Sequence, residues 1–152
     1  MPDAVAVASN RFQEKLGAPS SGAATKVVDH LNDYVRQFIA HAPFVVMATA
    51  NADGQCDASP KGGHPGFVKV LDDRHLLLPD VRGNRLFQSY ENIDANAQVG
   101  LVFFIPGIDY TARVNGTAQV VDEADLQQRG ISVEVFDPDE NAALLQGLLV
   151  EV

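Results

Sequence analysis

The chain has 152 residues, of which 46% are hydrophobic and 20% charged, and it carries a formal net charge of −9. This length favours one domain, and the balance of residue types is that of a globular protein. The acidic balance argues against a nucleic-acid-binding surface, and no apolar run is long enough to span a membrane.

The acidic residues gather toward the C-terminus. From Asp122 onward there are eight acidic residues and one basic residue, whereas residues 1–121 hold twelve acidic and ten basic residues. The single Cys56 excludes a disulfide within the chain and argues against a thiolate metal site. The N-terminus lacks a basic region followed by a long apolar stretch, which is the mark of a secretory signal. We therefore expect a cytoplasmic protein that binds neither nucleic acid nor membrane.

The N-terminal residues predict an arm followed by one domain. Small and polar residues dominate residues 1–24, and the stretch GAPSSGAA at 17–24 disfavours regular structure. A short helix is predicted from Asn10 to Leu16. We expect residues 1–24 to form a partly flexible arm and residues 25–152 to form a single domain.

A long amphipathic helix is predicted at the start of this domain. Apolar residues recur at three- and four-residue spacing from Val27 to Ile39, which places them on one helix face. Thr25 is the expected N-cap, and Pro43 is the expected stop.

Short apolar or alternating runs separated by turn residues predict strands along the rest of the chain. These runs are 44–49, 55–59, 66–71, 75–79, 99–105, 110–121, 131–136 and 148–152. Turns are predicted at 51–54, 72–75 and 106–109, and short helices at 84–94, 124–130 and 139–146. Helices do not alternate regularly with strands, so a doubly wound parallel sheet is disfavoured. The order predicts an α+β fold built on a mainly antiparallel small barrel or sandwich.

Two stretches place glycine beside cationic side chains directly after predicted strands, namely SPKGG (59–63) and VRGNR (81–85). Glycine lets backbone N–H groups approach a ligand closely and form anion-binding nests. Lys61, Arg82 and Arg85 would add charge-assisted hydrogen bonds to a dianion such as a phosphate monoester. If Asn84 begins the following helix, its free N–H groups would add to the same site. Together the two stretches predict a phosphate cradle without the spacing of a P-loop.

Other residue patterns give weaker support for chemistry. The four histidines have no metal-ligand spacing, and His64, which alone lies near SPKGG, is most simply a loop residue. Cys56 on a predicted strand is more typical of a small core residue than of a nucleophile. Ser59 lacks the context of a nucleophile elbow, and Asp72 with Asp73 is typical of a turn. No metal site and no catalytic side chain are therefore predicted.

Several stretches occur together in the order found in one family. They are FVVMATANADG, DASPKGGHPGFVKVLDD, LLLPDVRGNRL, NIDANAQVGLVFFIPG and ARVNGTAQV, and they cover about residues 25–121. The chain resembles the pyridoxamine 5′-phosphate oxidase-related proteins, and among them a subgroup of FMN-dependent enzymes with the motifs SP(K/R)G and PD…GNR. The resemblance implies a split β-barrel that forms a homodimer and binds FMN at the subunit interface.

The resemblance also implies which residues hold FMN. Ser59, Pro60, Lys61 and Gly62 match the first motif, which is expected along the flavin ring and the ribityl phosphate arm. The residues that match the second motif, whose arginines and asparagine would hold the phosphate, are Pro79, Asp80, Arg82, Asn84 and Arg85. Two further residues, Thr111 and Arg113, lie on the long strand that in such folds can reach the partner's flavin.

The chain departs from this subgroup at one point. Relatives continue past a strand like LLVEV into a histidine-cysteine…lysine-alanine segment and an arginine-serine…tryptophan segment, whereas this sequence ends at Val152 and has no tryptophan. This departure, with the missing substrate-phosphate residues of pyridoxamine phosphate oxidase, argues against that particular activity.

The leading expectation is an FMN-dependent oxidoreductase that acts on a small molecule by hydride transfer through the flavin. Lys61 near the ring edge would stabilise negative charge on reduced flavin. One alternative is a flavin-binding carrier or sensor without turnover. Another is a split barrel that binds heme or a deazaflavin, for which His64 and His75 are the candidate axial ligands near the expected pocket.

Overall fold

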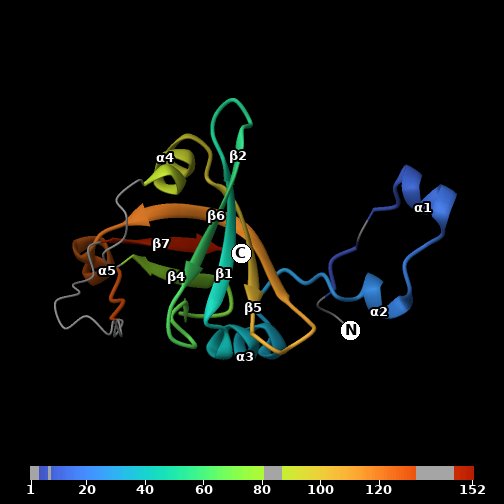
Figure 1. Ribbon diagram of the computed structural model, residues 1–152, viewed down its shortest axis with the longest axis horizontal. Helices are drawn as coiled ribbons and strands as arrows, with labels where there is room; N and C mark the ends of the chain where they lie inside the picture. The colour runs from blue at the N-terminus through green and yellow to red at the C-terminus, as the bar shows by residue number, and fades with distance from the viewer. Residues whose placement is uncertain (1–3, 7, 81–86, 133–145) are drawn as a thin grey trace.

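The computed structural model describes residues 4–6, 8–80, 87–132 and 146–152. The helices are α1 (Arg11–Leu16), α2 (Ser21–Ala24), α3 (Asp33–His41), α4 (Gln88–Ala95) and α5 (Glu123–Gln128). The strands are β1 (Phe44–Ala50), β2 (Cys56–Gly62), β3 (Lys69–Val70), β4 (His75–Asp80), β5 (Gln98–Phe104), β6 (Ala112–Val121) and β7 (Gln146–Glu151). Figure 1 shows these elements along the chain.

The described strands form one sheet in the order β2-β1-β5-β6-β7-β4-β3. Every neighbouring pair is antiparallel. The sheet curls so that β1 and β2 pass in front of β4 and β7, while α4 lies at one end of the barrel and α3 at the other (Figure 1). The predicted α+β class with a mainly antiparallel sheet is confirmed.

The two faces of the sheet bury different clusters. The inner face carries the main core, which is formed by Val45, Met47, Leu76, Leu78, Leu101, Phe103, Leu148 and Val150 together with Leu31, Phe38 and Ile39. On the outer face, Leu77, Val121 and Leu149 pack against Leu126 of α5 in a smaller cluster. Because side chains alternate along a strand, each strand residue can be assigned to one of these faces from its register.

The predicted start of the long helix at Thr25 is wrong, because α3 begins at Asp33. Asn32 is the N-cap, and its side chain accepts a hydrogen bond from the N–H of Val35 at 3.0 Å. Residues 25–32 are instead turn or extended chain, and Val28 forms a β-bridge with Ala4. Val27, Val28 and Leu31 therefore match a helical period without forming a helix.

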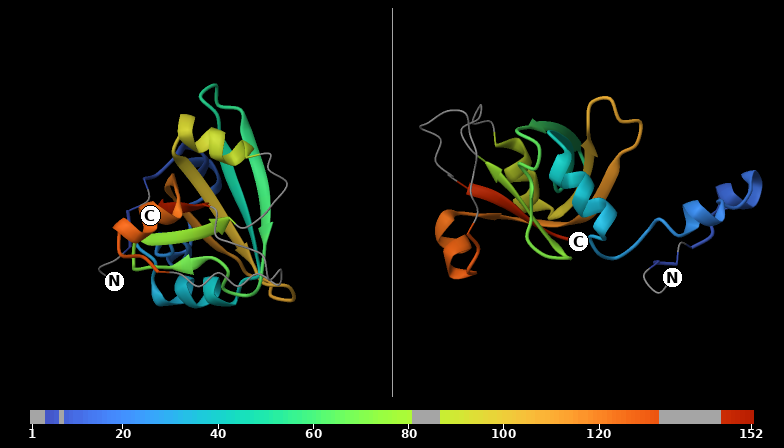
Figure 2. Two further views of the ribbon diagram at one scale, coloured as in Figure 1. Left: turned by 90° about the vertical axis from the view of Figure 1, so that its left-hand side faces the viewer. Right: turned by 90° about the horizontal axis from the view of Figure 1, so that it is seen from below.

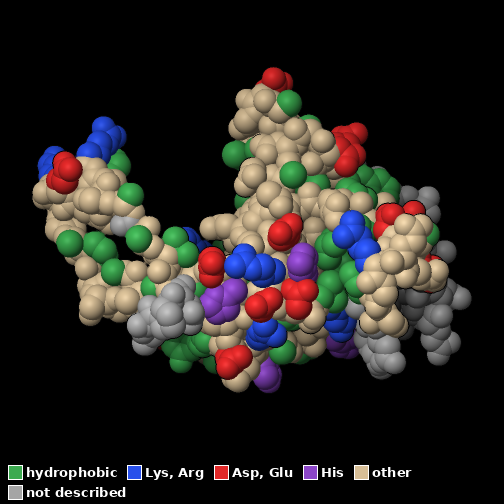
Figure 3. All heavy atoms as spheres, turned by 180° about the vertical axis from the view of Figure 1, so that it is seen from behind, with side chains coloured by type: hydrophobic (Ala, Val, Ile, Leu, Met, Phe, Trp, Pro, Cys, Tyr) green, Lys and Arg blue, Asp and Glu red, His purple; other side chains and the backbone are tan. Residues whose placement is uncertain are grey.

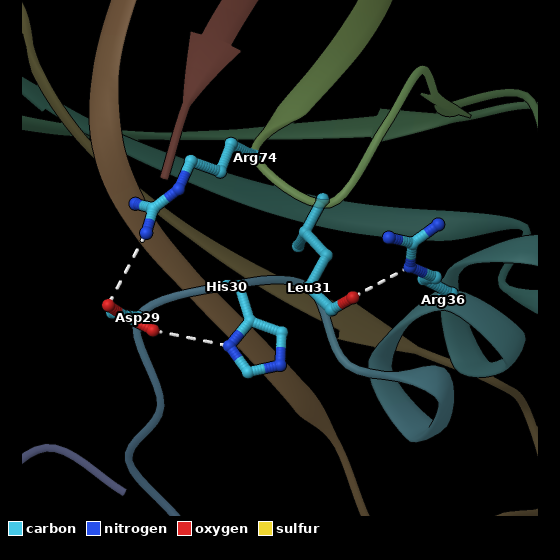
Figure 4. Close-up of polar contacts among 5 residues, drawn as sticks. All are labelled: Asp29, His30, Leu31, Arg36 and Arg74. Atoms are coloured by element: carbon cyan, nitrogen blue, oxygen red, sulfur yellow. Dashed lines mark hydrogen bonds and ion pairs between the residues drawn. The ribbon is translucent and has the colours of Figure 1, made fainter. Parts of the chain in front are cut away.

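The segment before α3 is fastened to the turn between β3 and β4 (Figure 4). The N–H of Leu31 donates to the carbonyl of Asp73 at 2.7 Å, and Nε of Arg36 donates to the Leu31 carbonyl at 2.7 Å. Nη2 of Arg74 donates to the carboxylate of Asp29 at 3.3 Å. The buried Leu31 side chain joins the main core, so this connection has a fixed place on the barrel.

Strand β2 is longer than predicted, because it runs through SPKG to Gly62 instead of ending at Ser59. It pairs with β1 over its whole length, with Lys61 opposite Val45 and Ser59 opposite Met47. Pro60 is tolerated because β2 is an edge strand, which has a partner on one side only. The expectation that SPKGG follows the strand is therefore wrong, because most of it lies within the strand.

The other predicted elements differ mainly in length. The turn at 51–54 closes the β1–β2 hairpin, with Gly54 at a φ of 78°, and the turn at 106–109 closes the β5–β6 hairpin. The strand predicted at 66–71 is reduced to β3. The helix predicted at 139–146 lies almost entirely, and the strand at 131–136 mostly, outside the described residues. No described helix is long and apolar enough to cross a membrane.

Candidate cofactor site

The residues of the first motif are divided between the two faces of β2. Ser59 and Lys61 are half-buried and lie on the inner face, in register with the buried Met47 and Val45 of β1. Pro60 and Gly62 are exposed on the outer face. A ligand along the inner edge of β2 would therefore meet the hydroxyl of Ser59 and the ammonium of Lys61.

Lys61 differs from the cations that stabilise the barrel. Nζ of Lys69 donates to the carbonyl of Gly66 at 3.0 Å, and the guanidinium groups of Arg36 and Arg74 are both hydrogen-bonded. Within the described part of the chain, Lys61 makes no hydrogen bond or ion pair through its side chain. The ammonium of Lys61 could therefore bind an anionic ligand without breaking a contact to another described residue.

The two glycines that follow Lys61 have different structural roles. A Cβ at Gly62 would lie 3.6 Å from the carbonyl oxygen of Pro43 and 3.7 Å from Phe44, which is ordinary contact. A Cβ at Gly63 would lie 2.7 Å from a ring carbon of Phe67, which is a clash. The fold itself therefore requires glycine at 63, whereas an alanine at 62 would fit.

The second motif begins at the end of β4. Oη of Tyr90, on α4, donates to Oδ2 of Asp80 at 2.8 Å. Tyr90 is only 8% exposed. The pKa of its hydroxyl is raised well above the ordinary value, chiefly by this burial and secondly by the neighbouring Asp80 carboxylate. A second anchor of α4 is the buried hydrogen bond from Nδ2 of Asn92 to Oγ1 of Thr49 at 3.0 Å. Asp80 and α4 are thus held firmly on either side of residues 81–86.

Arg82, Asn84 and Arg85 lie outside the described residues, so their predicted phosphate contacts stay predictions. The helix predicted to begin at Asn84 begins at Gln88. Its N-cap is Phe87, which has a φ of 51° and no capping side chain. The N-terminus of α4 is therefore at Gln88 and not at Asn84, and the predicted contacts of Asn84 itself lie outside the described residues.

Thr111 and Arg113 lie on the face opposite to Lys61. Arg113 pairs with Val102, which pairs with Val46, which in turn pairs with Pro60, so these residues form a row across the outer face. Three strand spacings separate Pro60 from Arg113, or about 14 Å. Thr111 directly precedes the buried Ala112, which places both predicted residues on the outer side. One chain therefore does not bring Arg113 to Lys61.

The outer face beside Arg113 is apolar and exposed, which the sequence interpretation missed. Phe44 and Phe104 are 39% and 38% exposed, and their ring centroids lie 6.1 Å apart. Val46 and Val102 continue this surface in the next row. The signal was present, because FVVMATA and VGLVFF are apolar at both odd and even positions and so predict strands covered on both faces.

Comparison with known protein families gives a match over most of the barrel. Residues 31–142, which are 112 of the 152 residues, match the family model described as pyridoxamine 5′-phosphate oxidase. The chain belongs to this family. The resemblance drawn from the motifs is therefore confirmed, and it holds for a longer segment than the motifs themselves. Among curated proteins, none matches the chain.

Solved structures share the fold at low identity. A protein of Lactobacillus delbrueckii provisionally named a pyridoxamine 5′-phosphate oxidase superposes with a TM-score of 0.58 and 24% identity, over 83% of this chain and 93% of its own. HupZ of Group A Streptococcus gives 0.54 and 18%, over 79% and 87%. A protein named F420 reductase gives 0.50 and 17%, over 76% and 90%. The family member described here thus has the split β-barrel fold that was predicted.

A cavity of about 300 Å³ lies apart from the predicted site. It is on the outer face and is lined by His75, Ala97, Thr117, Ala118, Gln119, Arg129, Leu149 and Glu151. None of these is a predicted cofactor residue. His75 is bonded through Nδ1 to Asp72 at 2.9 Å and lies on the face away from Lys61, so it is not near the expected pocket. Cys56, predicted as a core residue, is exposed.

Proposed function

We propose that this member of the pyridoxamine 5′-phosphate oxidase family binds FMN and acts as an FMN-dependent oxidoreductase on a small molecule. The observation that carries the proposal is the half-buried Lys61 on the inner face of β2, whose side chain makes no hydrogen bond or ion pair with the other described residues. It lies within the motif that the family uses around the flavin, and it is the kind of group that a ribityl phosphate or a reduced flavin ring would neutralise.

The residues of this chain have separable tasks in the proposed complex. Ser59 and Lys61 would bind along the flavin and its phosphate arm, and the open backbone at Gly62 would allow close approach. Asp80, fixed by Tyr90, would hold the start of the second motif in place. Bound FMN supplies the hydride chemistry, and the protein supplies orientation, charge and exclusion of water.

A homodimer is part of the proposal. Because Arg113 and Lys61 lie on opposite faces, one chain cannot place both at one flavin. A second copy would have to supply its own Thr111 and Arg113 to the flavin of this chain, and the exposed Phe44 and Phe104 are apolar side chains that such a dimer could cover. Burial of exposed aromatic side chains would stabilise such an interface.

The test is a titration of the purified protein with FMN, followed by flavin absorbance and fluorescence. The expected result is a yellow protein that releases FMN on denaturation. Lys61→Met should weaken FMN binding about tenfold, because the loss of one charge-assisted hydrogen bond costs about 1.4 kcal/mol. The control is Arg129→Met, which removes a cation at the distant cavity and should change the FMN affinity less than twofold. A colourless protein that ignores added FMN would refute the proposal.

The same preparation separates the competing functions. Because the barrel is shared with a protein named F420 reductase, the deazaflavin F420 and heme are titrated beside FMN. Preference for either one over FMN would replace the cofactor in the proposal. Reduction of bound flavin by NADH or NADPH, with reoxidation by an added acceptor, supports an oxidoreductase, whereas flavin that binds without turnover indicates a carrier or sensor.

A further inference from the structure

The cavity on the outer face is enclosed by the sheet and by the end of α5. Its lining residues belong to β4, β6 and β7, with Ala97 from the residues before β5 and Arg129 from the C-cap of α5. Figure 2 shows α5 on the side of β6 and β7 that faces away from β1 and β2. The volume of about 300 Å³ lies at the lower end of the range for small-molecule sites, roughly 300–1,000 Å³. The cavity is therefore large enough for a molecule of amino-acid size.

Strand pairing brings three polar residues into one row on this face. His75 of β4 lies opposite Glu151 of β7, which in turn lies opposite Thr117 of β6. Gln119 follows two residues later on β6, so it points to the same side of the sheet. Figure 3 views the molecule from this side, where histidine, acidic and basic side chains lie close together. Because all four residues line the cavity, the sheet gathers several hydrogen-bonding groups around one volume.

The fold holds both walls of the cavity in place. A Cβ at Gly116 would overlap the carbonyl oxygen of Glu151, so glycine allows β6 to approach the backbone of β7 at this point. On the other wall, the buried Leu126 packs α5 against Leu149 and its neighbours on the sheet. Arg129 follows directly as the C-cap of this helix. The backbone positions of Glu151 and Arg129 are thus set by packing that is independent of any ligand.

Two opposite charges line the cavity without pairing with each other. The guanidinium of Arg129 and the carboxylate of Glu151 form no ion pair, and neither side chain makes a hydrogen bond with another described residue. Arginine binds carboxylates through two parallel N–H groups, and a carboxylate accepts hydrogen bonds from an ammonium group. The cavity therefore offers one place for an anionic group and another for a cationic group of the same molecule.

His75 adds a hydrogen-bond acceptor beside Glu151. Nδ1 of His75 lies 2.9 Å from each carboxylate oxygen of Asp72. Because an ionised carboxylate only accepts hydrogen bonds, Nδ1 carries the proton, and Nε2 of the neutral ring is left as an acceptor. Glu151 and His75 together favour a donor such as an ammonium group, whereas Arg129 favours a carboxylate.

We propose that this cavity binds a small zwitterion of amino-acid size, with its carboxylate on Arg129 and its ammonium group on Glu151. Thr117 and Gln119 add hydrogen bonds to these polar groups, and Leu149 contacts the hydrocarbon part of the ligand. The inference does not depend on FMN, because no residue that lines the cavity belongs to the predicted cofactor site. The protein then has a second ligand site on the side of the sheet away from Lys61.

A nuclear magnetic resonance titration of the nitrogen-15-labelled full chain tests this with four probes. L-2-Aminopentanoate and 5-aminopentanoate carry both charges, at short and long separation, whereas pentanoate and pentylamine carry one charge each. We expect one of the two amino acids to bind about tenfold more tightly than either single-charge probe, because it makes one more charge-assisted hydrogen bond. Its largest amide shifts should lie at residues 117–119 and 149–151. Equal binding of all four probes, no binding of either amino acid, or largest shifts elsewhere would overturn the inference.

Variants separate the roles of the two charged side chains. Arg129→Met should weaken binding of the preferred amino acid about tenfold and leave that of pentylamine unchanged, and Glu151→Gln should weaken it similarly and leave that of pentanoate unchanged. The matched controls are Lys15→Met and Glu91→Gln, which remove exposed charges outside the cavity and should change the affinity less than twofold. If the controls weaken binding as much as the cavity variants do, net charge alone is responsible and the inference is wrong. FMN titration of the same variants reports separately on the cofactor, so either proposal can fail alone.

Discussion

The hydrogen bond between Tyr90 and Asp80 gives the sharpest prediction about the candidate site. Tyr90→Phe removes the hydroxyl 2.8 Å from Oδ2 of Asp80 and leaves the packing of the ring. Hydrogen bonds to charged groups contribute about 1.5–3 kcal/mol, and because Asp80 is only half-buried, water can replace part of this. We expect a loss of about 1–2 kcal/mol, which for a domain of this size lowers Tm by roughly 2–8 °C.

The same change should weaken FMN binding about tenfold, because Asp80 directly precedes the residues expected to hold the phosphate. Thr49→Val is the matched control. It replaces the acceptor of another described side-chain hydrogen bond of α4, that from Asn92, and it leaves the contact between Tyr90 and Asp80 in place. Differential scanning fluorimetry and FMN fluorescence titration are measured for both variants. If they lose stability equally and also lose FMN affinity equally, Asp80 does not position the site, and the reasoning is refuted.

The pH dependence of the Tyr90 contact has a definite sign. The pKa of Tyr90 is raised in the folded protein by burial and then by the Asp80 carboxylate. The folded state therefore holds the proton more tightly than the unfolded state, so the contribution is complete below the unfolded pKa of about 10 and is lost as pH rises above it. The stability difference between wild type and Tyr90→Phe should be constant from pH 6 to 9 and should change only in more alkaline solution.

Three further predictions follow from neighbouring features. Gly62→Ala should leave Tm nearly unchanged but weaken FMN binding, whereas Gly63→Ala should lower Tm because its Cβ would clash with the ring of Phe67. A larger loss of Tm for Gly62→Ala than for Gly63→Ala in thermal melts, or unchanged FMN affinity of Gly62→Ala in titrations, would contradict this. In the FMN-bound protein, Lys61→Met should lower the flavin midpoint potential in a redox titration, and an unchanged potential would show that Lys61 does not face the ring. The pKa of Asp29 is lowered chiefly by the hydrogen bond to His30, so the stabilisation that it provides is present above about pH 4 and is lost as pH falls through the lower folded value. Urea melts of Asp29→Asn and wild type should therefore differ at neutral pH and converge as the solution becomes strongly acidic.

Local turn chemistry was readable from the sequence, and long-range competition was not. The turn at 51–54 was predicted because Asn51 and Gly54 favour a tight hairpin between two apolar runs, and Gly54 does adopt a positive φ. The start of α3 was missed because Val27, Val28 and Leu31 fit a helical period. In the structure, Val28 instead forms a bridge with Ala4, and Leu31 is buried in the core. Asn32, and not Thr25, is the residue that caps the helix.

In the candidate site too, the sequence indicated local features but not those that depend on the arrangement of the whole sheet. The sequence predicts that Lys61 and Gly62 bind an anion, and the structure adds that the Lys61 side chain makes no hydrogen bond or ion pair with the other described residues. The sequence did not predict that Lys61 and Gly62 belong to a strand, because the neighbouring proline and glycine residues have low strand propensity. Such residues are tolerated in an edge strand, and the position of β2 at the edge depends on the arrangement of the whole sheet. The separation of Arg113 from Lys61 onto opposite faces likewise depends on the register of four strands.

The edge position of β2 also restricts how this protein can assemble. An open strand edge is a template on which another chain can add a strand, and such addition leads readily to fibres or aggregates. Pro60 lies in the middle of β2 and has no N–H to donate, and at the opposite end of the sheet β3 has only two residues. Among the described strands, Pro60 interrupts the edge at one end of the sheet and the edge strand at the other end is very short, so strand addition at either end is disfavoured.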